Sequence, residues 1–323
     1  MYRKNKTYGG FISMEDPAGF ENIFQTDIIF STARSCLSYI IKHEKIKLIY
    51  LPYYICDVVI ECIKKHKILI IYYEINDQFE IKTILSSIKS HDFLLIINYF
   101  GLKSNYITKL VKTFGKKLIV DNSQAFFAKK IEGVWSFNSA RKFFSVVDGA
   151  FLYPPRNIKH KVINKEVANY NNDYLTQKKI GNNQYAYQKY LSHENNLDCN
   201  IKIISNDSKK RLLQLNLNLI TNIRRTNFNF LNLKLGFMNK FKLNYIKEEV
   251  PLYYPLLINV MIRDKLIKKG VFIPQLWKEV LTRDKQNYQT EKYLAQYLIC
   301  LPIDQRYNKK DMKIIYNIIR GVL

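Results

Sequence analysis

The sequence predicts an α/β fold with a mostly parallel central sheet flanked by helices, followed by a smaller C-terminal α/β domain. Two observations carry this prediction. Short apolar runs rich in β-branched residues alternate with amphipathic segments through the first half of the chain. These runs lack polar side chains on both faces, which is typical of parallel strands covered on both sides by helices. The length of 323 residues suffices for one large domain or two of ordinary size.

The expected elements of the first half follow one another in regular order. We expect strands over residues 47–52, 68–73, 93–99 and 117–120. The spacing of apolar residues predicts helices between them, over residues 57–66, 81–90 and 106–114. Ligands of such sheets bind beyond the carboxyl ends of the strands, so we expect the functional site at that edge.

The second half of the chain is less regular. Residues 157–200 predict an irregular excursion or a surface helix, and a long helix from residue 212 predicts a connector into the C-terminal unit. Within that unit we expect a strand over 253–258, a helix over 263–269 ended by Gly270, and a final helix over 310–320. These observations predict a large domain over residues 1–210 and a small one over residues 211–323.

The chain is strongly basic. It holds 51 Lys and Arg against 27 Asp and Glu, a formal net charge of +24, yet 47% of its residues are hydrophobic, which excludes a disordered basic tail. Such a charge raises the hypothesis of a nucleic-acid-binding protein. The lysines are scattered as singles and pairs, and no zinc finger or RNA-recognition signature is present. We therefore favour a solvated basic surface, which would attract a phosphorylated substrate as well as nucleic acid.

The cysteines and the lengths of the apolar runs indicate in which compartment the protein works and whether it binds a metal ion. Five cysteines stand at scattered positions without metal-ligand spacing, which predicts reduced thiols and no metal site. No apolar run approaches the length of a membrane span, and no apolar signal region follows the basic N-terminus. We expect a soluble, cytoplasmic protein with no membrane span.

The first segment that bears on chemistry is residues 118–125, in which an apolar strand delivers Asp121 at its carboxyl end. A carboxylate at that edge of a sheet must meet a cation, a metal or a proton. Pyridoxal phosphate chemistry needs such a group, because the ring nitrogen must stay protonated for the ring to act as an electron sink. The alternative is an ordinary strand-end Asp that caps the following helix.

The second segment, residues 136–150, places Lys142 in a polar turn ahead of an apolar stretch. A lysine that forms a Schiff base must lose its proton. Adjacent Arg141 is expected to help by like-charge repulsion, provided that the two side chains are not fully solvated. The alternative is an ordinary solvated lysine.

The third segment is residues 30–37, where small hydroxylated residues precede an amphipathic helix. Ser31 or Thr32 is expected to cap that helix. Amides of the first turn, with the helix dipole, form a pocket suited to a cofactor phosphate. Arg34 could add a charge-assisted contact.

In this order the segments resemble those of a known family. The chain is similar to the DegT/DnrJ/StrS sugar-nucleotide aminotransferases, pyridoxal-phosphate enzymes of fold type I, and would be a short and divergent member. The resemblance runs through nearly the whole chain, from Gly9-Gly10-Phe11 through Leu51-Pro52-Tyr53-Tyr54, Asn98-Tyr99-Phe100-Gly101 and Tyr254-Pro255-Leu256 to Leu301-Pro302-Ile303-Asp304.

The resemblance implies roles for individual residues. Asp121 would pair with the pyridinium nitrogen, and Gln124 would lie close to the phenolic oxygen of the ring. Lys142, whose spacing to Asp148-Gly149 matches the family's lysine to Glu-Gly, would form the Schiff base and shuttle the proton. The cofactor phosphate would be cradled by Thr32, Ala33 and Arg34, which match the family's Ser-Gly-Thr loop.

The chain also departs from the family pattern. Phe137 stands where the family has a phosphate-binding serine, which leaves Ser136 and Ser139 on either side as candidates for that contact. Counting from Ser136 would put Arg141 in the lysine position, where no Schiff base can form. Ala33 stands where the family usually has a glycine, and Cys56 stands where it often has an aromatic residue.

The resemblance implies an aminotransferase acting on a nucleotide-linked keto sugar, with glutamate as the expected amino donor. Its product would feed lipopolysaccharide, O-antigen or capsule synthesis, and a homodimer is implied. A second hypothesis is a relative that performs another reaction on the sugar or has lost catalysis. The hypothesis from another class remains the basic nucleic-acid-binding protein.

Overall fold

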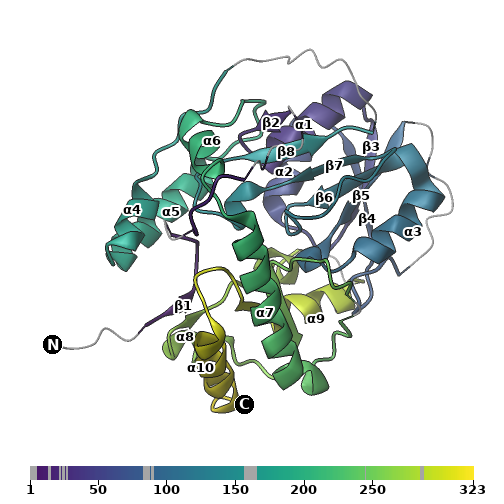
Figure 1. Ribbon diagram of the computed structural model, residues 1–323. Helices are drawn as coiled ribbons and strands as arrows, with labels where there is room; N and C mark the ends of the chain where they lie inside the picture. Colours follow the sequence, from purple (N-terminus) through teal and green to yellow (C-terminus); the bar gives the residue numbers. More distant parts are fainter. Residues whose placement is uncertain are drawn as a thin grey trace.

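The large sheet has the predicted parallel arrangement. The computed structural model describes residues 6–13, 16–21, 23, 26, 28–82, 88, 91–155, 166–243, 245–283 and 287–323. In this part of the chain the sheet has seven strands in the order β2-β8-β7-β6-β5-β3-β4 (Figure 1). Its parallel strands are β4 (Leu69–Tyr73), β3 (Leu48–Pro52), β5 (Asp92–Ile97), β6 (Leu118–Asn122) and β7 (Trp135–Asn138). Strands β8 (Ala150–Tyr153) and β2 (Ile29–Phe30) complete one edge in antiparallel pairing.

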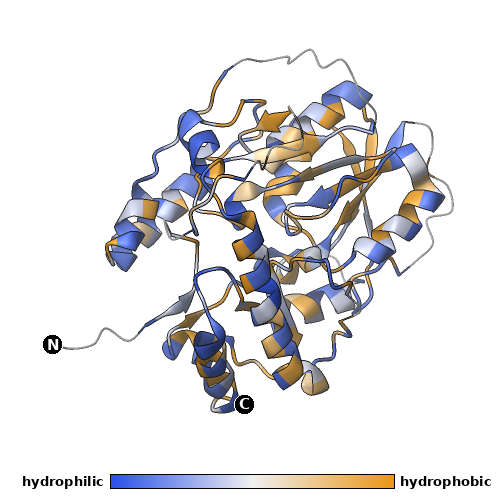
Figure 2. Cartoon of the chain, viewed as in Figure 1, coloured by the Kyte–Doolittle hydropathy of each residue, from blue (hydrophilic) through white to orange (hydrophobic). Residues whose placement is uncertain are grey.

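The helices of this part of the chain are α1 (Ala33–Glu44), α2 (Asp57–Lys65), which contacts α1, and α3 (Ser104–Phe114). Helix α1 contacts β7 and β8, and α3 contacts β6. Figure 2 shows apolar residues gathered along the central strands, as expected for strands covered on both faces. The helix expected over residues 81–90 lies mostly outside the described residues, and Ile81 forms an isolated bridge with Ile75.

The excursion after β8 holds short helices. Residues 156–165 lie outside the described part of the chain. Beyond them α4 (Asp173–Lys179) and α5 (Asn183–Asn196) pack against each other, and α6 (Asn206–Leu212) follows. The expected surface helix is therefore a helical hairpin. No helix that the structure describes is long and apolar enough to cross a membrane.

The C-terminal unit is built on the long helix α7 (Leu217–Leu235) and a two-stranded antiparallel sheet of β9 (Tyr253–Leu257) and β11 (Leu298–Pro302). The remaining elements are α8 (Arg263–Lys268), β10 (Val271–Phe272), α9 (Gln289–Tyr297) and α10 (Lys309–Arg320). Strand β1 (Tyr8–Gly9), from the start of the chain, pairs with β10 in parallel. The domain boundary near residue 210 stays a prediction, but this N-terminal strand forms a separate two-stranded sheet with β10 of the C-terminal unit.

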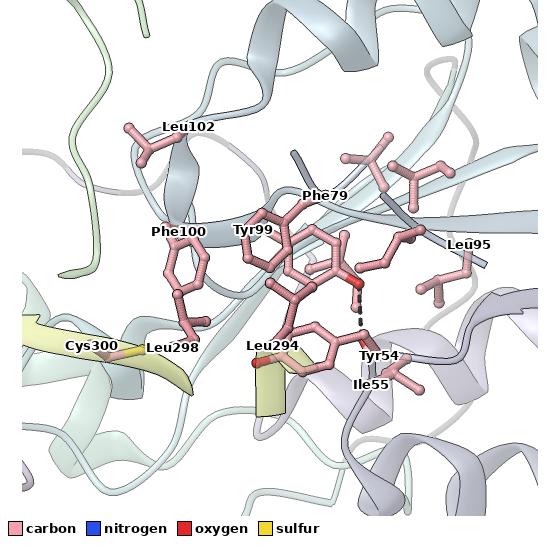
Figure 3. Packing of buried hydrophobic residues seen from close by; sticks show 14 of the residues in the cluster. Tyr54, Ile55, Phe79, Leu95, Tyr99, Phe100, Leu102, Leu294, Leu298 and Cys300 are labelled. Carbon is pink, nitrogen blue, oxygen red and sulfur yellow. Dashed lines mark hydrogen bonds between the residues drawn. The ribbon is translucent and has the colours of Figure 1, made fainter. Parts of the chain in front are cut away.

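One large apolar core links the two units. Figure 3 shows Tyr54 and Tyr99, which follow strands of the large sheet, beside Leu294 and Leu298 from the C-terminal elements. The Tyr99 hydroxyl donates to the Tyr54 carbonyl oxygen at 2.7 Å, which satisfies a polar group inside this core. The shared core holds C-terminal residues beside the carboxyl ends of the central strands.

Candidate active site

A cavity of about 320 Å³ lies at the carboxyl ends of the central strands. Ile97 ends β5, Asp121 lies near the end of β6, and Phe137 belongs to β7, and all three line it. The first turn of α1 and the turn that carries Lys142 contribute further lining residues. The site therefore lies at the edge that the sheet topology predicts.

Asp121 is a buried carboxylate, 6% exposed, that lines this cavity. Its Oδ1 accepts a hydrogen bond from the Ser123 backbone N–H at 2.7 Å. Burial raises the pKa of Asp121, and the charge of Lys142 and the hydrogen bonds from Ser123 offset this only in part. The negative charge of the Asp121 carboxylate is thus only partly compensated by its surroundings. A protonated nitrogen bound in the cavity would stabilise it.

Lys142 ends a short 3-10 turn, η3 (Ala140–Lys142), and lines the same cavity as Asp121. Among the described residues it makes no hydrogen bond or ion pair. The turn is fixed on both sides: the Ala140 N–H donates to the Gly149 carbonyl oxygen at 2.9 Å, and the Phe143 N–H donates to the Ala140 carbonyl oxygen at 2.9 Å. A lysine amine without a competing partner, on a fixed turn, is suited to reaction with a carbonyl group.

The neighbouring Arg141 also lines the cavity, but its charge is paired. It forms an ion pair with Glu194 of α5, with a second contact from Nη2 to Oε2 at 3.4 Å. Although burial alone would raise the pKa of Glu194, the guanidinium holds it below its usual value. This pairing opposes the like-charge repulsion that the sequence predicts between Arg141 and Lys142.

The start of helix α1 has the geometry expected of an anion site. Thr32 is the N-cap, and its hydroxyl accepts the Ser35 N–H at 3.0 Å. Thr32, Ala33 and Arg34 all line the cavity, and the backbone N–H groups of Ala33 and Arg34 have no hydrogen-bond partner in the described part of the chain. Arg34 Nη1 donates to the Leu197 carbonyl oxygen at 2.8 Å. The free amides and the helix dipole together suit a phosphate.

Gln124 is buried and oriented. Its Oε1 accepts the Phe100 N–H at 2.8 Å, so the side-chain NH₂ is left as a donor, and the residue lines the cavity. Gln124 therefore lies with Asp121 and Lys142 around one space, as the resemblance implies.

The two candidate serines differ. Ser139 lines the cavity, whereas Ser136 does not. Neighbouring side chains of a strand point to opposite faces, and Phe137 of β7 takes the cavity face, so Ser136 faces the other way. The Ser136 hydroxyl is buried and has no hydrogen-bond partner in the structure. Of the two candidates for the phosphate contact, the lining of the cavity therefore favours Ser139 over Ser136.

Several lining residues were not predicted from the sequence. Glu194 and Asn195 come from α5, and Leu276 and Trp277 come from the loop after β10. None belongs to a motif, and α5 has no apolar stripe to indicate which side faces inward. Cys56 lines the cavity where the family has an aromatic, and burial raises the pKa of its thiol, so it stays neutral near pH 7.

The donor set fits pyridoxal phosphate and not a metal ion. The cavity brings together a buried carboxylate, a lysine that makes no hydrogen bond or ion pair with the described residues, and the open amides of a helix start. In the part of the chain that the structure describes, no group of three or more His, Cys, Asp or Glu is arranged to hold a metal.

The fold is that of the pyridoxal-phosphate-dependent aminotransferases of fold type I, as the sequence predicts. The chain is similar to the crystal structure of a DegT DnrJ EryC1 StrS aminotransferase from Brucella abortus, with 14% identity and a TM-score of 0.61 over 91% of this chain and 85% of that one. It is similar to NtdA from Bacillus subtilis with bound cofactor PMP, with 15% identity and a TM-score of 0.57 over 91% and 73% of the chains.

A third similar structure is DesI in the presence of its TDP-sugar product, with 8% identity and a TM-score of 0.60 over 91% of this chain and 79% of that one. No family model and no curated protein sequence matches this chain. At these identities the likeness establishes the fold, and function must be argued from the site.

Proposed function

We propose that this protein is a pyridoxal-phosphate-dependent aminotransferase of the DegT/DnrJ/StrS type. One observation carries the proposal: Asp121 and Lys142 line a single cavity with the N-terminus of α1. These are the groups needed at the ring nitrogen, the aldehyde and the phosphate of the cofactor. The likeness to fold-type-I structures, one of them with PMP bound, supports the same cofactor here.

Each residue has a definite task in this proposal. Pyridoxal phosphate, when bound, supplies a ring that withdraws electrons from the substrate carbon and carries the amino group between substrates. The Asp121 carboxylate holds the proton on the ring nitrogen. The Gln124 NH₂ orients the ring through its phenolic oxygen, and the first-turn amides of Ala33 and Arg34 bind the phosphate.

The proton transfers fall to Lys142. Its Nζ takes a proton from the substrate carbon in one half of the reaction and returns one in the other half. Apolar side chains, including Leu37, Val59 and Leu276, line the same cavity and exclude water from these steps.

The substrate in this proposal is a keto sugar linked to a nucleotide, with glutamate as amino donor. The net charge of +24 favours a diphosphate-bearing substrate, and the similar DesI structure was obtained with a TDP-sugar product. By the same analogy we infer a cytoplasmic homodimer that serves lipopolysaccharide, O-antigen or capsule synthesis. The nucleic-acid-binding hypothesis is not favoured, since nothing in the cavity or the fold supports it.

The decisive experiment traps the cofactor on the protein. Purified protein incubated with pyridoxal phosphate should develop a visible absorbance band, and borohydride reduction followed by peptide mass spectrometry should place the label on Lys142. Lys142→Ala should lose both signals, whereas the matched neighbour Arg141→Ala should keep them. A label on another lysine would overturn the site assignment. No band, with tight and salt-sensitive DNA binding, would favour the nucleic-acid hypothesis.

A further inference from the structure

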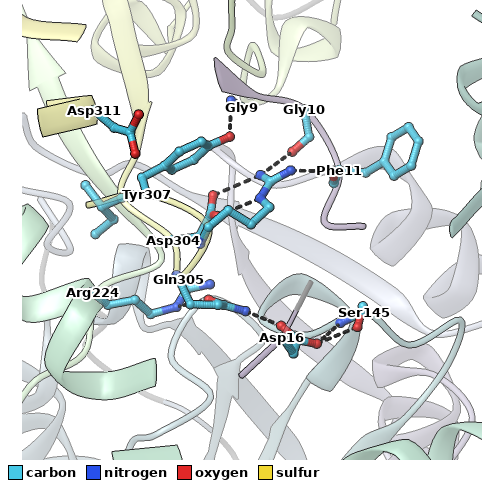
Figure 4. A network of polar contacts seen from close by, with 12 residues as sticks. Gly9, Gly10, Phe11, Asp16, Ser145, Arg224, Asp304, Gln305, Tyr307 and Asp311 are labelled. Atoms are coloured by element: carbon cyan, nitrogen blue, oxygen red, sulfur yellow. Dashed lines mark hydrogen bonds and ion pairs between the residues drawn. The ribbon is translucent and has the colours of Figure 1, made fainter. Parts of the chain in front are cut away.

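The backbone that follows Lys142 is held by a buried polar network built from distant parts of the chain. Figure 4 shows Arg224 of α7, Gln305 after β11, and Asp16 near the N-terminus converging beside Ser145. Gln305 is buried, Arg224 is completely so, and Asp16 is partly buried. None of the three lines the cavity.

Arg224 holds Phe143, the residue after Lys142, in two ways. Its Nη2 donates to the Phe143 carbonyl oxygen at 3.3 Å. Its guanidinium also lies 4.7 Å from the centroid of the Phe143 ring, a cation–π contact. Both the backbone and the side chain of Phe143 are therefore fixed by one charged group.

Gln305 and Asp16 complete the hold on this turn. Gln305 Nε2 donates to the same Phe143 carbonyl oxygen at 2.7 Å and to Asp16 Oδ1 at 2.6 Å, while its Oε1 accepts from Arg224 Nε at 3.0 Å. Asp16 Oδ2 accepts the Ser145 N–H at 2.7 Å and the Ser145 hydroxyl at 2.5 Å. The backbone is thus held at both ends of the segment 143–145: the Phe143 carbonyl oxygen accepts from Gln305, and the Ser145 N–H donates to Asp16.

The same guanidinium reaches the opposite side of the site. Arg224 Nη1 donates to the Leu252 carbonyl oxygen at 3.3 Å, and the Leu252 N–H donates to the Phe100 carbonyl oxygen at 2.9 Å. The Phe100 N–H in turn donates to Gln124 Oε1. A continuous chain of hydrogen bonds therefore joins the turn of Lys142 to the side chain of Gln124 through Arg224.

Burying such a group is costly, which calls for a reason. Burial lowers the pKa of Arg224 to about 10, and the nearby charges of Asp304 and Asp16 offset this only in part. An apolar side chain of similar volume would often be as stable at such a position. The planar guanidinium of Arg224 can donate in several directions at once. We therefore relate its burial to the backbone segments at Phe143 and Leu252, which it holds at a fixed distance from each other.

We propose that Arg224, with Gln305 and Asp16, is a positioning residue that sets the placement of the Lys142 amine relative to Gln124 and Asp121. The inference rests on the proposed function, because it takes Lys142 as the reacting amine. A displacement of about 1 Å of a reacting group can cost on the order of 100-fold in rate. The network is therefore expected to act on the rate of cofactor attachment more than on the fold.

The test compares Arg224→Gln and Gln305→Ala with Arg306→Gln. Arg306 is the sequence neighbour of Gln305 and a partly buried arginine, but the hydrogen bonds that the structure describes join it to Asp304 and the Phe11 carbonyl oxygen rather than to the turn of Lys142. After incubation with pyridoxal phosphate, borohydride trapping at Lys142 should slow by about 10- to 100-fold in Arg224→Gln and less in Gln305→Ala. Arg306→Gln should trap at the wild-type rate. Thermal unfolding midpoints show whether the variants are folded.

Three outcomes separate the hypotheses. Wild-type trapping at Lys142 with unimpaired trapping in both folded variants overturns this inference alone. Failure of the wild type to label Lys142 overturns the proposed function and this inference with it. If Arg224→Gln does not fold, Gln305→Ala decides the matter, since it removes the hydrogen bonds of Gln305 to Phe143, Arg224 and Asp16 but keeps both charged side chains in place.

Discussion

Glu194 of α5 and Arg141 of the turn η3 form an ion pair at the edge of the cavity, beside Lys142. We expect Glu194→Gln to destabilise the protein by about 1–3 kcal/mol, less than the full cost of a buried pair, because both side chains are partly exposed. A double-mutant cycle with Arg141→Met, measured by urea unfolding, should give a coupling energy of about 1 kcal/mol. A coupling near zero at neutral pH would contradict this.

The same pair has a predictable pH dependence. Despite its burial, Glu194 has a pKa that Arg141 holds below the ordinary value, so the folded state binds its proton less tightly than the unfolded state. Its stabilising contribution is full above the unfolded pKa of about 4.3 and is lost as the pH falls through the folded value. The coupling energy should therefore persist at pH 7 and disappear in acid.

Asp121→Asn should separate stability from function. Burial raises the pKa of Asp121, so the stability that this group contributes is full below its unfolded pKa and is lost as the pH rises through the folded value. Without cofactor, Asp121→Asn should therefore be as stable as the wild type at neutral pH, or more so. Affinity for pyridoxal phosphate, followed by the visible band, should fall, because the protonated ring nitrogen loses its charge partner. Unchanged affinity would exclude the assigned role.

Thr32→Ala and Asn308→Ala form a matched pair of cap deletions. Thr32 caps α1 in the cavity, and Asn308 caps α10 with a capping box away from it. Each substitution should cost about 0.5–2 kcal/mol in urea unfolding. Of the two, Thr32→Ala should weaken pyridoxal phosphate binding, since α1, unlike α10, presents its first turn to the cavity. Equal binding losses would show that the effect comes from stability alone.

The two serines around Phe137 offer a further pair. Ser139→Ala should weaken cofactor binding, because Ser139 lines the cavity. Ser136→Ala should leave binding unchanged and keep or raise stability, because it removes a buried hydroxyl that has no hydrogen-bond partner among the described residues. Dissociation constants and unfolding free energies of both variants check this prediction. Weaker binding in Ser136→Ala would restore it as a phosphate ligand.

Much of the site follows from local pattern. Asp121 could be placed because an apolar run predicts a buried strand and the next polar residue must then lie at its end. Thr32 could be placed because hydroxyl residues before an amphipathic segment are typical caps. Both positions depend on neighbours in sequence: the structure places Asp121 near the end of β6, and of the two predicted caps, Ser31 and Thr32, it shows Thr32.

Other features depend on contacts that local pattern does not contain. The sequence left Ser136 and Ser139 as alternative candidates, because neighbouring side chains of a strand point to opposite faces and only the register shows which of them faces the cavity. Arg224 is fully buried, although an arginine in an amphipathic helix normally predicts a solvated position. Glu194 lies on a helix without an apolar stripe, so only the tertiary packing reveals which partner it meets.

The parallel pairing of Tyr8 with Val271 has a consequence for synthesis on the ribosome. The chain emerges from its N-terminus at about 5–20 residues per second, so β1 must wait many seconds until β10 becomes available. The large sheet can form in that interval, but the first strand cannot be anchored. The docking of β1 therefore comes after the synthesis of residues 271–272, late in the assembly of the fold.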